Sequence, residues 1–586
     1  MLYEYQHYHE AADSLDELVR CLADSMDPES ISIALLPRTL YMSSDEILSA
    51  ELRNNGVKPR ETRKAIIEII DDIFAQPRPF VLINTKSGRL SNKQTQSEVF
   101  RADPEYKKLI LSPASELEAD DMWKGAIWQF FRYSTLSHTW EDVGEPEFRH
   151  VENRSVDELT DSFPNTKLRM FCKKTHEHGY WWAWSDTCCI NKAEKEVLNM
   201  SLRSMYRWYS DSSLTIVHLK GVFQQLEVDV DTLLDILDGL LKEFVDCRWN
   251  KRAWTLQEYF ASRVIQFYTE DWKPYLPIDR YSDADPVNHK TSFAIKRGMQ
   301  LVTGLDADSL AALKPGTDDA RQKLGLASTR KATRKEDMAY SLLGVFKVTI
   351  EAIYGDDEVP RALGRLLGAL LTKSADVTIL AWTGKTSEYN TCLPAEIIVY
   401  HDSESLHVPH PIEEAELPAA SIQNMLSSMT PTDLDSAVKL HDRLLDSPPP
   451  ELHHGRLKLS CIWFPLHSVT RDSPMSQTYT ATVPLLGKVE IKTADDLSSA
   501  RNMVLVHPWF RRLLDPDIPM LHSARHERAL RLLAALRQPF GALLLASNHT
   551  SRDYERVAAD ELITVQIRED VSPEKLLENI HVLYIR

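Results

Sequence analysis

The chain has 586 residues, of which 43% are hydrophobic and 26% are charged, a composition that is neither disordered nor membrane-like. Its formal net charge is −18, from 68 basic and 86 acidic side chains. This balance argues against a nucleic-acid partner, because binding phosphates needs clustered Lys and Arg. A chain of this length is too long for one hydrophobic core, so we expect about two to four domains.

The seven cysteines are sparse, odd in number and irregularly spaced, unlike the disulfide framework of a secreted protein. The first residues lack the basic and then apolar order of a signal peptide. No apolar run approaches the roughly 20 residues of a membrane-spanning helix. We therefore expect a cytoplasmic protein with no membrane span.

The N-terminal region, residues 1–77, is predicted to be helical. Ser43 and Glu46 have the spacing of a capping box, and apolar side chains recur at helical spacing from residue 65 to residue 74. Pro77 ends this pattern, and a short apolar strand is predicted at residues 80–83.

An α/β domain is predicted over residues 78–270, because strand and helix patterns alternate there in the way that is typical of a parallel sheet. Strands are expected at residues 132–137, 180–184, 214–219 and 263–268. Helices are expected at residues 193–209, 230–245 and 252–260.

Two further regions complete the expected organisation. Residues 271–380 have helical patterns and are predicted to extend the α/β domain. Residues 381–586 are predicted to form an antiparallel β-rich domain, from short apolar runs at residues 459–464, 479–483, 543–545 and 563–567. A Pro-rich and acidic stretch near residues 407–450 is predicted to be a loop or linker.

Polar side chains follow the first two strands of the predicted sheet. Ser137, His138 and Trp140 lie at the end of the first strand, and Asp186 follows the second. Ligands of open parallel sheets collect at the carboxyl ends of the strands, so these side chains share one rim if the two strands are neighbours. There Asp186 would accept hydrogen bonds from a ribose or orient His138, and Trp140 would offer a stacking face.

Glu258 lies in a largely apolar and aromatic stretch, residues 252–260. On a helix it would sit one turn from Trp254. A carboxylate beside an indole and partly withdrawn from water has a raised pKa, which suits acid, base or ion-stabilising chemistry. The alternative is a helix that packs through its aromatic side chains while Glu258 faces solvent or pairs with Arg252 or Arg263.

Other chemistries are open at the same rim. A thiol hydrolase would use Cys188 or Cys189 as the nucleophile, His138 as the base and Asp186 to orient it. A metal site is not expected, because adjacent cysteines chelate poorly and no Cys-x-x-Cys occurs. A nucleotide pocket is neither supported nor excluded by composition, and no Gly-x-Gly-x-x-Gly or Gly-x-x-x-x-Gly-Lys-Ser/Thr loop is present.

Three motifs resemble those of the fungal heterokaryon incompatibility (HET) domain proteins, particularly the basidiomycete type. They read STLSHTW at residues 134–140, WSDTCCINK at 184–192 and RAWTLQE at 252–258. The likeness continues downstream through residues 334–344, 354–355 and 376–382, so it covers about residues 78–400. Two residues depart from the family pattern: Glu141 stands where Gly usually follows the Trp of the first motif, and Asn191 where Asp is common. A reshaped first loop would change the access of a ligand.

HET domains are distantly similar to Toll/interleukin-1-receptor (TIR) domains, flavodoxin-like signalling modules of which some cleave NAD. Trp254-x-Leu256-x-Glu258 resembles the run that contains their catalytic Glu. The resemblance implies a flavodoxin-like parallel sheet, Glu258 as the catalytic residue, and NAD as a substrate with no cofactor required.

The same resemblance implies roles for the rim and for the whole chain. Ser137, His138 and Trp140 would border the nucleotide near Asp186, and Trp254 would pack against the nicotinamide or anchor its helix. The chain would be a nonself-recognition effector that triggers programmed cell death. The alternative is a non-enzymatic module that acts by self-association or by binding a recognition partner, with Glu258 purely structural.

Overall fold

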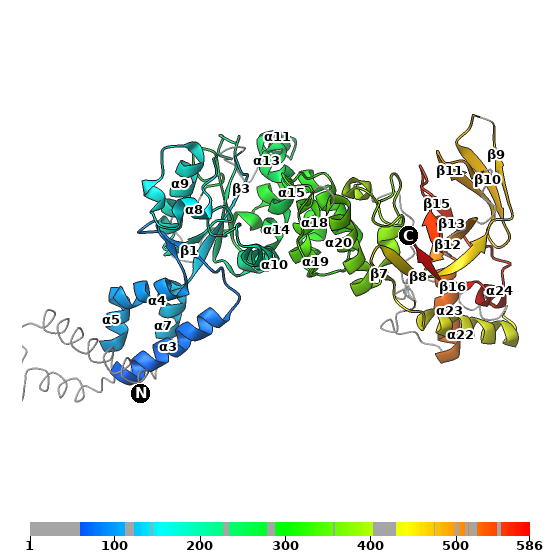
Figure 1. Ribbon diagram of the computed structural model, residues 1–586, viewed down its shortest axis with the longest axis horizontal. Coiled ribbons are helices and arrows are strands. Elements are labelled where there is room, and N and C mark those ends of the chain that lie inside the picture. The colour runs from blue at the N-terminus through cyan, green and yellow to red at the C-terminus, as the bar shows by residue number, and fades with distance from the viewer. Residues whose placement is uncertain are drawn as a thin grey trace, which may run out of the picture.

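The computed structural model describes residues 59–111, 122–141, 144–226, 234–277, 287–355, 358–401, 429–473, 475–497, 503–509, 514, 524–547 and 553–586. These residues form four regions, of which the first lies beside the second, while the second, third and fourth follow one another along the long axis of the molecule in chain order (Figure 1). The capping box predicted at Ser43 and Glu46 lies outside the described residues.

The first region is a group of helices. The first of them contains residues 65–74, for which the apolar spacing predicted a helix. Ile66, Ile70 and Ile73 face inward from the first of them and are buried. The helices are α3 (Pro59–Ala75), α4 (Lys93–Ala102), α5 (Pro104–Leu111) and α7 (Met122–Phe130). They pack against one another beside the edge of the first sheet (Figure 1).

The second region contains a six-stranded sheet in the order β2-β1-β4-β3-β5-β6. Its strands are β1 (Leu82–Asn84), β2 (Leu90–Ser91), β3 (Tyr133–His138), β4 (Trp182–Trp184), β5 (Leu214–His218) and β6 (Ile265–Tyr268). The last four are parallel and fully buried, and they confirm the four predicted strands. Strands β1 and β2 add an antiparallel edge.

The parallel strands stand in the spatial order second, first, third, fourth. The chain therefore leaves β3 toward one side of the sheet for β4 and returns to the other side for β5. Ligand crevices of open α/β sheets form where the order reverses in this way, outside the carboxyl ends of the strands. The end of β3, at Ser137 and His138, lies at that point.

Helices pack around this sheet. They are α8 (Phe148–Val151), α9 (Phe163–Glu177), α10 (Lys195–Asp211), α11 (Leu234–Leu240), α12 (Lys242–Asp246), α13 (Arg248–Lys251) and α14 (Ala253–Ala261). Helix α14 contacts both β3 and α10, and Ala253 to Tyr259 are all buried. The helix expected at residues 230–245 is two helices, α11 and α12, and Gly239 near the break has low helix propensity.

The third region is helical, as predicted for residues 271–380. Its α-helices are α15 (Phe293–Thr303), α16 (Ala307–Ala312), α17 (Ala320–Ser328), α18 (Asp337–Tyr340), α19 (Leu343–Phe346) and α20 (Val359–Ser374). Backbone hydrogen bonds tie it to the start of α14, because Ala253 N–H donates to Lys331 O at 2.8 Å and Lys331 N–H donates to Lys251 O at 2.6 Å.

Gly344 allows α19 to lie directly on α10. A Cβ at this position would lie 2.1 Å from the Cβ of Tyr206, an atom that no side-chain rotation can move away. We expect Gly344→Ala to lower the free energy of unfolding by about 2–3 kcal/mol through overpacking, measured by urea denaturation.

Gly239→Ala is the matched control, because Gly239 also lies on a helix and a Cβ there would meet no heavy atom within 4 Å. This change is expected to raise stability by up to about 1 kcal/mol, since Ala favours the helix over Gly. Equal effects of the two substitutions would contradict the tight contact at Gly344.

The fourth region is rich in β-strands and mostly antiparallel. Strands β9 (Ser468–Arg471), β10 (Thr478–Val483) and β11 (Gly487–Lys492) form a three-stranded sheet. A seven-stranded sheet contains β7 (Glu451–His453), β8 (Arg456–Pro465), β12 (Met503–Pro508), β13 (Phe540–Ser547), β14 (Tyr554–Arg556), β15 (Ile563–Val565) and β16 (Ile580–Ile585). Its pairings are antiparallel except that of β14 with β16.

The prediction of a loop or linker was wrong for residues 431–445. They form helix α22 (Pro431–Leu445), which packs against α23 (Ala524–Leu536) and α24 (Pro573–Leu577). Thr430 and Asp433 form a capping box at its start, and Pro431 occupies its first turn. Across the described residues, no helix has both the length and the apolarity needed to cross a membrane.

Candidate functional site

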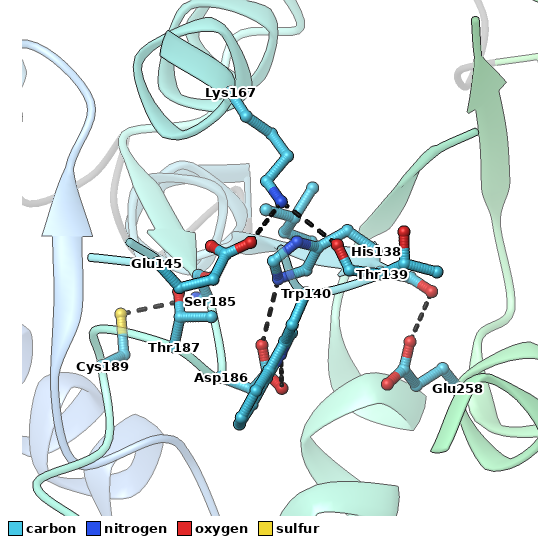
Figure 2. Close-up of polar contacts among 12 residues, drawn as sticks. His138, Thr139, Trp140, Glu145, Lys167, Ser185, Asp186, Thr187, Cys189 and Glu258 are labelled. Atoms are coloured by element: carbon cyan, nitrogen blue, oxygen red, sulfur yellow. Dashed lines mark hydrogen bonds and ion pairs between the residues drawn. The ribbon is translucent and has the colours of Figure 1, made fainter. Parts of the chain in front are cut away.

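The polar residues predicted at the strand ends lie together at the carboxyl edge of the first sheet. Ser137 and His138 end β3, and Asp186 follows β4. Glu258 reaches Ser137 from helix α14. Figure 2 shows Trp140 pointing toward Asp186, and Glu258 lying on the other side of the His138–Thr139 backbone from Lys167 and Glu145.

Glu258 is 3% exposed. Its Oε2 accepts a hydrogen bond from Ser137 Oγ, which accepts one from the indole nitrogen of Trp249 at 2.7 Å. Burial, followed by the negative charge of Asp186, raises the pKa of Glu258 to about 8, although Arg252 opposes the shift. The carboxyl group is therefore mostly neutral at neutral pH. The burial of Glu258 also shows that the alternative of a solvent-facing side chain was wrong.

His138, Asp186 and Trp140 form a second hydrogen-bonded group. His138 Nε2 lies 3.3 Å from Asp186 Oδ1, and Trp140 Nε1 donates to Asp186 Oδ2 at 3.0 Å. Burial opposes ionisation of Asp186, but the hydrogen bond with His138 and the positive charge of Arg252 hold its pKa below the usual range. Burial and then the charge of Lys167 lower the pKa of His138, so its ring is neutral.

Two cations lie over the indole ring of Trp140. Lys192 Nζ is 4.0 Å from the ring centroid, and the guanidinium carbon of Arg252 is 4.8 Å from it. Arg252 also places Nη2 3.8 Å from Asp186 Oδ2. Cation–π attraction at a partly desolvated site stabilises such an arrangement by about 1–2 kcal/mol. The rim thus combines an aromatic ring, two positive charges and one carboxylate.

The loop after Trp140 is held by buried ion pairs. Lys167 Nζ donates to Glu145 Oε1 at 2.6 Å and to Thr139 O at 3.2 Å. Glu141 Oε2 accepts a hydrogen bond from Lys220 Nζ, and Glu141 Oε1 lies 3.8 Å from Lys167 Nζ. The residue that departs from the family pattern is therefore built into the loop, where its charge fixes the position of the backbone that follows β3.

The geometry marks neither Cys188 nor Cys189 as a nucleophile. Cys188 and Cys189 are buried, and burial raises the pKa of Cys189 well above its ordinary value. The Sγ of Cys189 accepts a hydrogen bond from the backbone N–H of Ser185 at 3.4 Å, and His138 Nδ1 has no hydrogen-bond partner. A buried thiol with no base beside it is a poor nucleophile, so the geometry does not favour a Cys-His hydrolase.

His176 and His178, at the end of α9, could each bind a metal, but both have other contacts. His176 Nδ1 lies 3.3 Å from Thr85 Oγ1, and His178 Nε2 lies 3.0 Å from the hydroxyl of Tyr268. Within the part of the chain that the structure describes, no group of three or more His, Cys, Asp or Glu residues could hold a metal ion.

Trp254 does not share the environment of Glu258, although it lies one turn away. Its indole nitrogen donates to Asp337 Oδ2 at 3.0 Å, and the hydroxyl of Tyr354 donates to Asp337 Oδ1 at 2.9 Å. Burial raises the pKa of Asp337. These contacts tie α14 to the helical region and favour the anchoring role of Trp254 over contact with a ligand.

Sequence reasoning missed three residues that support the site: Trp249, Lys167 and Arg330. Arg330 is buried, and its Nη1 donates to Arg252 O and to Thr255 Oγ1, each at 3.0 Å. Burial lowers the pKa of Arg330 to about 10, and its positive charge favours the ionised form of Glu258. No motif surrounds it in the sequence, and the α14 residues it contacts lie more than 70 positions upstream.

Comparisons with known proteins match the part of the chain that forms the sheet. The family model described as heterokaryon incompatibility protein (HET) matches residues 133–236. Vegetative incompatibility protein HET-E-1 of Podospora anserina is 30% identical over 239 residues, which cover 40% of this chain but only 16% of that protein. No solved structure matches the chain significantly. The sheet from β3 to β5, with the first two motifs at its carboxyl edge, is thus that of a heterokaryon incompatibility (HET) domain.

Proposed function

We propose that this chain is a heterokaryon incompatibility effector in nonself recognition, and that it triggers cell death by hydrolysing NAD at Glu258. The observation that carries the enzymatic part is the buried Glu258 carboxyl, hydrogen-bonded to Ser137 at the end of the central strand β3. The likeness to the vegetative incompatibility protein HET-E-1 of Podospora anserina supports the biological role.

The sheet topology supports a TIR-like site. The parallel strands β4-β3-β5-β6 have the second, first, third, fourth order of flavodoxin-like sheets, in which ligands bind at the reversal of strand order. Ser137, His138 and Asp186 stand at that point, and Glu258 faces it from α14.

Hydrolysis of NAD breaks the bond between the nicotinamide nitrogen and ribose C1′. The electron pair leaves with nicotinamide, and water adds to C1′ to give ADP-ribose and a proton. The ribosyl centre is cationic as nicotinamide leaves, so an ionised Glu258 would stabilise it. The positive nicotinamide ring would favour this ionised form, and activity is expected to rise with pH toward the pKa of about 8.

The rest of the rim suits a dinucleotide. Arg252 and Lys192 carry the positive charge that a diphosphate requires, and they lie over the ring of Trp140. Asp186 would accept hydrogen bonds from ribose hydroxyls beside the neutral ring of His138.

Self-association is a second candidate function, with Glu258 purely structural. Exposed apolar side chains on the contacting helices α11 and α15 favour it: Leu234 is 51% exposed, Ile236 56% and Phe293 63%. Apolar side chains grouped on a surface mark contact sites for other proteins or for a second copy of the chain.

The decisive experiment incubates the full chain with NAD and measures nicotinamide release by chromatography. Glu258→Gln is expected to reduce the rate by about a hundredfold or more, because a positioned carboxyl group contributes at least that much. Glu196→Gln is the control, since Glu196 is exposed on α10. If the wild type releases no nicotinamide at concentrations that favour oligomers, the proposal of an NAD hydrolase is rejected. If Glu258→Gln keeps the wild-type rate, the assignment of Glu258 as the catalytic residue is rejected.

A further inference from the structure

A cavity of about 630 Å³ lies far along the chain from Glu258, where the helical region meets the C-terminal region. Small-molecule sites in proteins typically have volumes of about 300–1,000 Å³. Residues 347–351 and one face of α20 line it, together with Tyr389 and with Leu452 of β7. Figure 1 shows α20 and β7 side by side at this junction.

The lining is positively charged. Lys347, Arg365 and Lys373 contribute three cations, against the single carboxylate of Glu351. Glu351 Oε1 lies 3.5 Å from Lys195 Nζ, so its charge is partly compensated from outside the cavity. In a chain with a net charge of −18, this local excess of positive charge attracts anions.

The cations differ in how firmly they are held. Arg365 donates to Glu358 Oε2 at 2.6 Å and to the Tyr340 hydroxyl at 2.8 Å, and its Nε is buried without an acceptor. Lys373 Nζ donates to Lys347 O at 2.5 Å, which leaves two of its three hydrogens for other acceptors. Both lysine side chains are exposed, so they can close on an anion at little cost.

The other half of the lining is apolar and closely packed on α20. Tyr389 and Leu452 are seated on α20 by two glycines, because a Cβ on Gly364 would lie 2.3 Å from Tyr389 Cδ1 and one on Gly368 would lie 2.5 Å from Leu452 Cδ2. Ala369 of α20 adds a small side chain next to this surface. An aromatic ring stacks well on a Tyr that is fixed in this way.

We propose that this cavity binds an organic phosphate monoester with an aromatic body. The phosphate lies between Lys347 and Lys373, and the aromatic body packs against Tyr389 and Leu452. A dianionic phosphate matches two point charges better than a single carboxylate does. The site does not depend on Glu258 or on NAD hydrolysis, and a bound ligand stabilises the junction of the two regions.

Calorimetric titration of the full chain with phenyl phosphate tests the charged half of the site. Lys373→Gln is expected to weaken binding about tenfold, which is the effect of losing a hydrogen bond to a charged group. Lys439→Gln removes the same charge from an exposed position on α22 and leaves binding unchanged. No binding of phenyl phosphate by the wild type, or equal binding by the Lys373→Gln and wild-type proteins, overturns the proposal.

Ala369→Phe tests the aromatic half of the cavity, because it places a ring beside Tyr389 and leaves every charge in place. It is expected to weaken binding of phenyl phosphate at least tenfold, whereas surface attraction to the lysines alone would survive it. Inorganic phosphate is expected to bind at least tenfold more weakly than phenyl phosphate, since it leaves the Tyr389 surface uncovered. Equal affinity for inorganic phosphate and phenyl phosphate would overturn the proposal that the ligand has an aromatic body. Glu258→Gln binds phenyl phosphate like the wild type, which separates this result from the fate of the NAD proposal.

Discussion

Replacing Glu258 by Gln is expected to stabilise the protein by about 4–5 kcal/mol above pH 8 and to change its stability little near pH 5. The folded protein raises the carboxyl pKa from 4.5 to about 8. Between these values the unfolded chain has released a proton that the folded chain still holds, so the wild type loses stability as the pH rises. Gln has no charge to bury, and its amide oxygen still accepts the hydrogen bond from Ser137.

The measurement is urea denaturation of both proteins at about pH 5, 7 and 9, followed by tryptophan fluorescence. Trp182, Trp184 and Trp208 are buried in and beside the first sheet, so the signal reports the region that contains Glu258. The difference between the proteins should grow with pH, whereas Glu196→Gln should show no such trend. A difference that does not depend on pH would mean that Glu258 ionises normally in the folded protein.

Arg330→Ala is expected to destabilise the protein by about 3–5 kcal/mol. The substitution removes the two hydrogen bonds that the buried guanidinium donates to Arg252 O and Thr255 Oγ1. It also opens a cavity beside α14. It also removes a positive charge that acts on Glu258, so the pKa of that carboxyl should rise further.

Thermal and urea denaturation measure the loss, and Arg330→Lys should recover part of it because Lys restores a charged donor. Arg361→Ala is the surface control. Arg361 is exposed and pairs with Glu358 at 3.2 Å, so its removal should change stability by less than about 1 kcal/mol. Similar losses for Arg330→Ala and Arg361→Ala would show that the buried contacts contribute little.

The parallel sheet could be predicted because its strands are short apolar runs with helical patterns between them. Strands β3, β4, β5 and β6 are buried on both faces, which gives such runs. The antiparallel edge formed by β1 and β2 was predicted only in part, since β2 has two residues. Residues 431–445 were misread because proline and acidic residues outweighed the capping signal at Thr430.

Some residues of the candidate site could be predicted from the sequence and others could not. Ser137, His138 and Asp186 could be predicted because strand ends of a parallel sheet converge. Glu258 could be predicted because a carboxylate stands out in an apolar helix. Helical spacing did not predict that Trp254 and Glu258 have different surroundings. Helix α14 is buried on every side, so each of its faces packs against a different neighbour. Arg330 contacts α14 only through tertiary packing, so the local sequence does not predict that contact.

Asp337 accepts hydrogen bonds from Trp254 of α14 and from Tyr354, and so joins the helix that carries Glu258 to the region after the sheet. The family match ends at residue 236, before any of these residues. Recombination between related genes that exchanged only the matched segment would replace Ser137 and Asp186, two partners of Glu258, with those of another chain. A crossover between residues 270 and 330 would separate Glu258 from Arg330 and Asp337. The segment that can be exchanged without disturbing the Glu258 site therefore runs at least from Ser137 to Tyr354.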